Sequence, residues 1–144
     1  MAESELTVHV FVGAFADHET ACLYSEEQWP PEPGPDATDE ARSAWEDAGP
    51  TWAMGDELDA YLDSDFIETI SGDDRFDYLA TELADPRAAE RLREEYAAMT
   101  TTLVLIGSNA LDGRPANFAS TSVLTYCGEY ACPPLDMSWL KAAR

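Results

Sequence analysis

Three carboxylates in the middle of the chain have the residue types and the spacing to hold a metal ion. Asp63, Asp65 and Glu68 lie within a run of six residues, and hard cations such as Ca²⁺ and Mg²⁺ are bound by clustered carboxylate oxygens. Phe66 and Ile67 interrupt the series of ligands and glycine that a calcium-binding loop requires. We therefore predict no metal and no other cofactor, with a metal-dependent enzyme using these three carboxylates as an alternative.

A second constellation pairs a thiol with an imidazole. His18 and Cys22 are four residues apart, so both would lie on one face of a helix, where an imidazole can activate a thiol as a nucleophile. Neighbours at this spacing are usually incidental. Gly107 and Ser108 lack the second glycine of a serine nucleophile elbow. We predict that the protein is not an enzyme and has no catalytic residue.

Carboxylates dominate the stretch between Asp56 and Asp77, where nine acids accompany one cation, Arg75. Aromatic residues are set among these acids, which predicts an acidic surface mounted on apolar anchors. Such a composition suits the binding of a protein better than a reaction. The residues that we expect to bind this partner are Trp45, Trp52, Asp56, Glu57, Asp59, Tyr61, Asp63, Asp65, Glu68, Asp73 and Asp74.

Three tryptophans flank the proline-rich and acidic stretches, namely Trp29, Trp45 and Trp52. Each indole could belong to the core. Each could equally anchor an interface, where aromatic residues ringed by polar groups dominate the binding energy. The sequence leaves both alternatives open.

The net charge of −21 is unevenly distributed over the 144 residues. Residues 1–80 carry 21 acids and two bases, whereas residues 81–144 carry eight acids and six bases. Such a field attracts basic proteins and repels nucleic acids and anionic membranes. We therefore expect a basic protein partner, with no direct nucleic-acid or membrane contact. General solubility in a salty cytoplasm is the alternative, and the single lysine, Lys141, is consistent with it.

Cysteine usage and the absence of targeting signals indicate a cytoplasmic protein. Cys22, Cys127 and Cys132 have no paired spacing and are expected to be reduced thiols. The first ten residues lack the basic and apolar regions of a signal peptide, and no apolar run approaches the ~20 residues of a membrane span. The length fits one domain over residues 1–144.

The hydrophobic pattern predicts an α+β fold. We expect a small, mostly antiparallel sheet in which an interior N-terminal strand, Leu6–Val12, lies beside a C-terminal hairpin made of 101–107 and a strand within 118–127. An extended piece is expected at 66–70 and an exposed proline-rich loop at 30–37. Four to five helices should pack with this sheet, running from Asp17 to about Trp29, from Asp36 or Thr38 to Trp45, around 56–62, around 76–83 and from Pro86 to about Met99, with a further short helix in the tail.

The order of these elements resembles a known family. The opening VHVFVGAF at 8–15, an acidic middle containing DSDFIE at 63–68, a helical pair and a closing apolar strand resemble the immunity protein 22 family of bacterial polymorphic toxin systems. Phe11 stands where the family tends to have tryptophan, and the proline-rich segment is an insertion. The resemblance implies a small cytoplasmic inhibitor that binds a cognate toxin effector and performs no catalysis.

Charge and resemblance together predict a function. Toxins that cut nucleic acid present basic clefts, and an acidic inhibitor can occupy such a cleft in place of phosphates. We predict an acidic cytoplasmic immunity protein that neutralises a basic, nuclease-type toxin by blocking its site. The alternative is a phage or mobile-element nucleic-acid mimic that inhibits a host defence complex, of the anti-CRISPR or anti-restriction type. The sequence does not indicate the oligomeric state.

Overall fold

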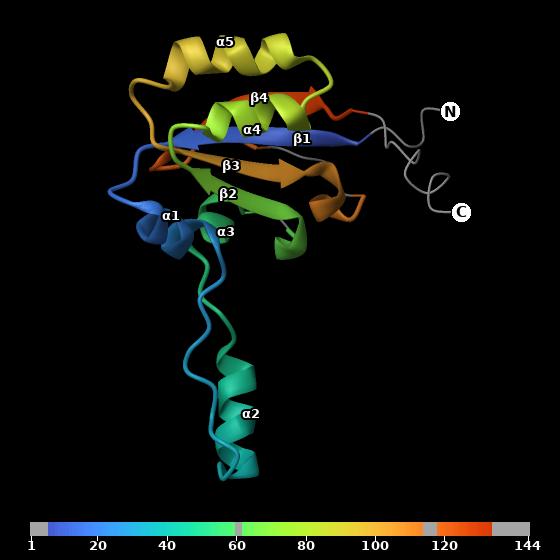
Figure 1. Ribbon diagram of the computed structural model, residues 1–144. Helices are drawn as coiled ribbons and strands as arrows, with labels where there is room; N and C mark the ends of the chain where they lie inside the picture. Colours follow the sequence, from blue (N-terminus) through green and yellow to red (C-terminus); the bar gives the residue numbers. More distant parts are fainter. Residues whose placement is uncertain (1–5, 60–61, 114–117, 134–144) are drawn as a thin grey trace, which may run out of the picture.

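A computed structural model describes residues 6–59, 62–113 and 118–133 (Figure 1). Its helices lie on both faces of a single antiparallel sheet, which confirms the predicted α+β fold. The strands, in the order β2-β3-β1-β4, are β1 (Thr7–Gly13), β2 (Ile67–Ser71), β3 (Thr102–Gly107) and β4 (Leu124–Ala131). No helix in these described ranges has the length and apolar composition of a membrane span.

β1 is an interior strand of this sheet, as its apolar composition predicted. Val10 faces Leu105 of β3 on one side and Gly128 of β4 on the other. The predicted C-terminal hairpin is therefore wrong, because β3 and β4 each pair with β1 and not with one another. The connection from 108 to 123 is far longer than the two to five residues typical of a hairpin loop, and it carries the chain past β1. The predicted extended piece is the edge strand β2.

One face of the sheet is covered by α4 (Arg75–Glu82) and α5 (Pro86–Tyr96), which pack against each other. Phe76, Leu79 and Leu83 are buried at the spacing that predicted this helix, and they share a cluster with strand residues. The Asp85 carboxylate accepts a 3.0 Å hydrogen bond from the Arg87 amide and caps α5, which begins at Pro86 as the sequence predicted. The short helix predicted in the tail lies outside the described residues.

The opposite face is covered by α1 (His18–Ser25) and α3 (Ala53–Leu58). Met54 and Leu58 of α3 are buried in the cluster that contains Phe11 of β1. The Asp17 carboxylate caps α1 through a 2.8 Å hydrogen bond from the Thr20 amide. Both helices differ in extent from the prediction: α1 ends at Ser25 instead of Trp29, and α3 begins before residue 56.

The early end of α1 has a local cause. Gln28 leaves the helical path and forms an isolated antiparallel bridge with Thr51, with N–O distances of 2.7 and 2.9 Å in the two directions. Between these residues the chain passes through the proline-rich segment, in which residues 30–37 form no helix or strand. It then forms α2 (Asp39–Ala48). The Thr38 hydroxyl caps α2 at 3.1 Å from the Ala41 amide, which decides between the two predicted starts, Asp36 and Thr38.

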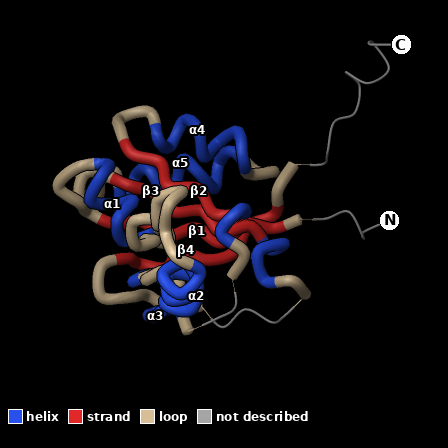
Figure 2. Tube along the Cα trace, turned by 90° about the horizontal axis from the view of Figure 1, so that it is seen from below, coloured by secondary structure: helices blue, strands red, loops and turns tan. Residues whose placement is uncertain are grey.

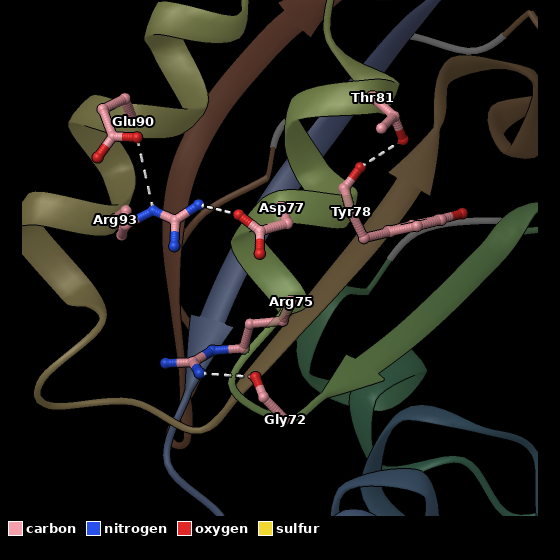
Figure 3. A network of polar contacts seen from close by, with 7 residues as sticks. All are labelled: Gly72, Arg75, Asp77, Tyr78, Thr81, Glu90 and Arg93. Atoms are coloured by element: carbon pink, nitrogen blue, oxygen red, sulfur yellow. Dashed lines mark hydrogen bonds and ion pairs between the residues drawn. The ribbon is translucent and has the colours of Figure 1, made fainter.

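The helical pair is tied to the sheet by a buried guanidinium. Only 5% of Arg75 is exposed, and its nitrogens donate to the carbonyls of Gly72 at 2.9 Å, Ala97 at 3.0 Å and Thr100 at 2.7 Å. These bonds connect the turn before α4 with the segment that joins α5 to β3. Figure 3 shows the bond from Arg75 to Gly72 beside the ion pair of Arg93 with Asp77, which links α5 to α4 on the outside.

Arg75→Met keeps the apolar stem and removes the guanidinium. We expect the free energy of unfolding to fall by about 2–3 kcal/mol, because buried carbonyls lose their donor. Urea denaturation would measure this change in the free energy of unfolding. The control is Arg87→Met, because the Arg87 side chain is 85% exposed. This substitution should change the free energy of unfolding by about 0.5 kcal/mol at most. Equal losses in the two variants would contradict the role given to Arg75.

Candidate protein-binding surface

The predicted partner-binding residues are distributed over several elements. Trp45 lies on α2, and Tyr61 falls outside the described residues. The others occupy three places on the body. The N-cap, body and end of α3 carry Trp52, Asp56, Glu57 and Asp59, the approach to β2 and the strand itself carry Asp63, Asp65 and Glu68, and the turn before α4 carries Asp73 and Asp74.

Glu57 is a structural carboxylate although it lies on the surface. It accepts hydrogen bonds from the Tyr24 hydroxyl at 2.7 Å and from the Ser122 amide and hydroxyl at 3.0 and 2.8 Å. The bond from Tyr24 is the main cause that lowers the pKa of Glu57, and the bonds from Ser122 add to it. Glu57 thereby connects α3 to α1 and to the loop that precedes β4.

Asp63 and Glu68 are also engaged within the fold. The Asp63 carboxylate accepts a 3.0 Å hydrogen bond from the Asp65 amide and caps the short 3-10 helix η2 (Ser64–Phe66). Glu68 on β2 accepts a 2.6 Å hydrogen bond from the Tyr78 hydroxyl on α4. Asp63 thus stabilises the turn that leads into β2, and Glu68 connects β2 to α4.

The tryptophans differ in their surroundings. The Trp52 indole donates a 2.8 Å hydrogen bond to the Ser25 carbonyl, and its ring lies so close to Gly55 that an added Cβ there would come within 2.6 Å of it. Trp52 therefore packs within the body. Trp45 instead donates to the Pro30 carbonyl at 2.8 Å, and its ring centre lies 5.1 Å from that of Trp29, which is 51% exposed.

Five of the predicted acids remain directed at solvent. Their side chains are exposed and form no hydrogen bond or ion pair with a described residue, because the ion pairs of the described chain use other carboxylates. These five residues, which we call the open carboxylates, are Asp56, Asp59, Asp65, Asp73 and Asp74. A partner can neutralise them without first breaking a contact that the described fold uses.

The geometry gives little support to reactive chemistry. No group of three or more His, Cys, Asp or Glu side chains among the described residues is placed to hold a metal ion. The Cys22 thiol does lie 3.4 Å from Nε2 of His18, as their spacing predicted. Burial is the first cause that raises the pKa of Cys22, and the negative charge of Glu26 adds to it. The thiol is therefore held in its protonated, less nucleophilic form.

A hollow beside the edge strand was not predicted. It has a volume of about 290 Å³, and its lining includes Phe66 of η2, Glu68 of β2 and Glu82 of α4. Burial, followed by the charge of Glu68, raises the pKa of Glu82. The sequence contains no signal for this pairing, because residues 14 apart on a strand and a helix meet only through the packing of α4 on the sheet.

A scan against protein-family models and searches of curated proteins and of solved structures each found no match to this chain. Its function is therefore inferred from the contacts and charges of the chain itself.

The bonds of Glu57 predict a pH-dependent stability. Because the pKa of Glu57 is lower in the folded chain, its contribution is present above the unfolded pKa of about 4.3 and is lost as the pH falls through the folded value. Glu57→Gln should lower Tm at pH 7, since a neutral acceptor forms weaker hydrogen bonds. The difference from the parent chain should close as the pH falls below about 4.

The control is Asp56→Asn, one position earlier on the same helix, where the carboxylate is exposed and forms no hydrogen bond with a described residue. It should leave Tm unchanged across this pH series in thermal denaturation followed by circular dichroism. A Tm loss in Glu57→Gln that is independent of pH would contradict the assigned role.

Proposed function

We propose that this protein is an immunity protein that binds a basic, nuclease-type toxin effector and blocks its nucleic-acid site. One observation carries the proposal: the open carboxylates are exposed and have no described cation within ion-pair distance. A fold that leaves so much charge of one sign uncompensated on its surface is suited to a partner that supplies the opposite sign.

The physics of such an encounter supports blocking as the mode of inhibition. Lysine and arginine side chains that line a nuclease cleft bind phosphates through charge-assisted hydrogen bonds. Carboxylates can take the same positions, since they are also anionic oxygen acceptors. The field of a chain with net charge −21 would also raise the rate of encounter with a basic protein, by about 10 to 10³-fold at low salt.

Two further observations favour binding over catalysis. Of the three carboxylates that suggested a metal site, Asp63 and Glu68 accept hydrogen bonds within the fold. The resemblance of the element order to the immunity protein 22 family points to the same function, with the VHVFVGAF segment in the central strand β1 and the DSDFIE segment leading into β2.

The direct test uses the product of the gene immediately upstream, where the gene for a cognate toxin is expected. We expect its nuclease activity to be abolished by one equivalent of this protein, and co-expression to restore growth of a sensitive strain. An upstream product that is neither bound nor inhibited would overturn the proposal. Inhibition of a host defence nuclease instead would favour the nucleic-acid mimic.

The open carboxylates predict a kinetic effect on this complex. Asp65→Asn combined with Asp74→Asn should lower kon by about fivefold at low salt and leave koff nearly unchanged, since exposed charges mainly steer association. Stopped-flow fluorescence at two ionic strengths would measure both rate constants, and the effect should shrink at high salt.

The matched control removes two charges from α5, with Glu90→Gln and Glu94→Gln on its exposed side. This pair should change kon by less than about twofold. Equal effects in the two variants would mean that only net charge matters, and would contradict a binding surface in the N-terminal half.

A further inference from the structure

The segment between Gln28 and Thr51 forms an arm that stands away from the body. We call residues 29–50 the α2 arm. Figure 1 shows α2 beyond α1 and α3, at the end of two lengths of chain, and Figure 2 shows the same helix end-on from below. Neither hydrophobic cluster of the body contains a residue of this arm, and α2 has no buried residue. The arm therefore contributes little to the cores.

The α2 arm nevertheless has an internal structure. The Trp45 indole bonds to the Pro30 carbonyl and its ring lies against that of Trp29. The Arg42 guanidinium donates a 3.2 Å hydrogen bond to the Gly34 carbonyl. These contacts, with the fixed φ angles of the prolines, hold the helix against the incoming chain. A preformed element loses less conformational entropy when it binds than a disordered loop would.

The helix of the arm has two distinct faces. Ala41, Ala44, Trp45 and Ala48 follow the i, i+3, i+4, i+7 spacing of an apolar stripe. The three alanines are exposed, and Trp45 is half-buried against Trp29. The acids of the helix lie on the other side of it, at Asp39, Glu40, Glu46 and Asp47. An amphipathic helix normally buries its apolar stripe, and this one has no element of the described body against it.

We propose that the α2 arm docks as a helix into a groove of a basic protein partner, with its apolar stripe on the floor of the groove and its carboxylates against a basic rim. The inference rests on the proposed function and names the element that makes the contact. A single helix, about 10–12 Å across with its side chains, is recognised by this mode in many complexes.

Charge complementarity selects this occupant over a second copy of the chain. Residues 29–50 contain six acids and one arginine, a net charge of −5, and a second copy would bring the same sign and a total charge of −21. The exposed ring of Trp29 beside Trp45 supplies the kind of aromatic anchor that dominates binding energy when it is surrounded by polar groups. The open carboxylates of the body then steer the encounter, and the α2 arm holds the complex.

The test uses the product of the upstream gene as the probe and point variants of the full chain. Ala44→Gln with Ala48→Gln places two larger, polar side chains on the apolar stripe without changing the charge, and glutamine is a good helix former. We expect Kd to rise by about tenfold or more, mainly through koff, and to do so at low and high salt alike. The control is Ser43→Gln on the acidic side, for which Kd should change by less than about twofold.

A second variant replaces residues 29–50 by Asn-Gly, since the Gln28–Thr51 bridge brings the two ends together as in a hairpin. We expect it to fold, because both clusters of the body remain, and to bind at least about 100-fold more weakly in titration calorimetry. Full binding by this folded variant and by Ala44→Gln with Ala48→Gln would overturn the inference and leave the proposed function intact.

Failure of the full chain to bind the probe would overturn both proposals. Sedimentation equilibrium tests whether a second copy of the chain occupies the apolar stripe. A dimer of the full chain that becomes monomeric when the α2 arm is removed would show that it does, and would also overturn the inference.

Discussion

The burial of both faces of β1 is the constraint on which the rest of the structure depends. Val8, Val10 and Val12 point to one face and His9 and Phe11 to the other, and all five are buried. A strand of this composition must lie inside a sheet that is covered on both sides. The pair α4 and α5 provides one cover, and α1 with α3 provides the other.

This arrangement explains why α2 stands apart. Both faces of the sheet are already covered by other helices, so α2 is not needed to bury the sheet. The bridge between Gln28 and Thr51 joins the two ends of the α2 arm at the point where it leaves the body. The same bridge sets the direction in which residues 29–50 leave it. An element that the core does not need, yet that is capped and internally bonded, is one that a partner can use.

The acids of the chain have two different roles, which composition alone does not separate. Glu57 and Glu68 accept hydrogen bonds from tyrosines that are distant in the sequence, Tyr24 and Tyr78. Asp73 and Asp74 lie in an exposed turn and have no such donor. Whether a carboxylate supports the fold or remains available to a partner depends on these tertiary neighbours, so the spacing of the acids in the sequence could not distinguish the two roles.

Local signals in the sequence predicted local structure well. Thr38 and Asp85 were recognisable caps, and the spacing of Phe76 and Leu79 predicted the buried side of α4. Pairing over long distances was harder: the apolar strands β3 and β4 could have formed a hairpin, and only the need to place β1 between them decides otherwise. The projection of α2 had no signal beyond its flanking prolines, because a helix pattern does not tell which surface, if any, the helix covers.

Hydrogen–deuterium exchange of the full chain, with and without the upstream toxin, tests the central claim most directly. We expect slower amide exchange in residues 29–50 and in the turn at 72–74 when the toxin is bound, with unchanged exchange on α5. Slower exchange confined to α4 and α5, or no change anywhere on adding the toxin, would contradict it.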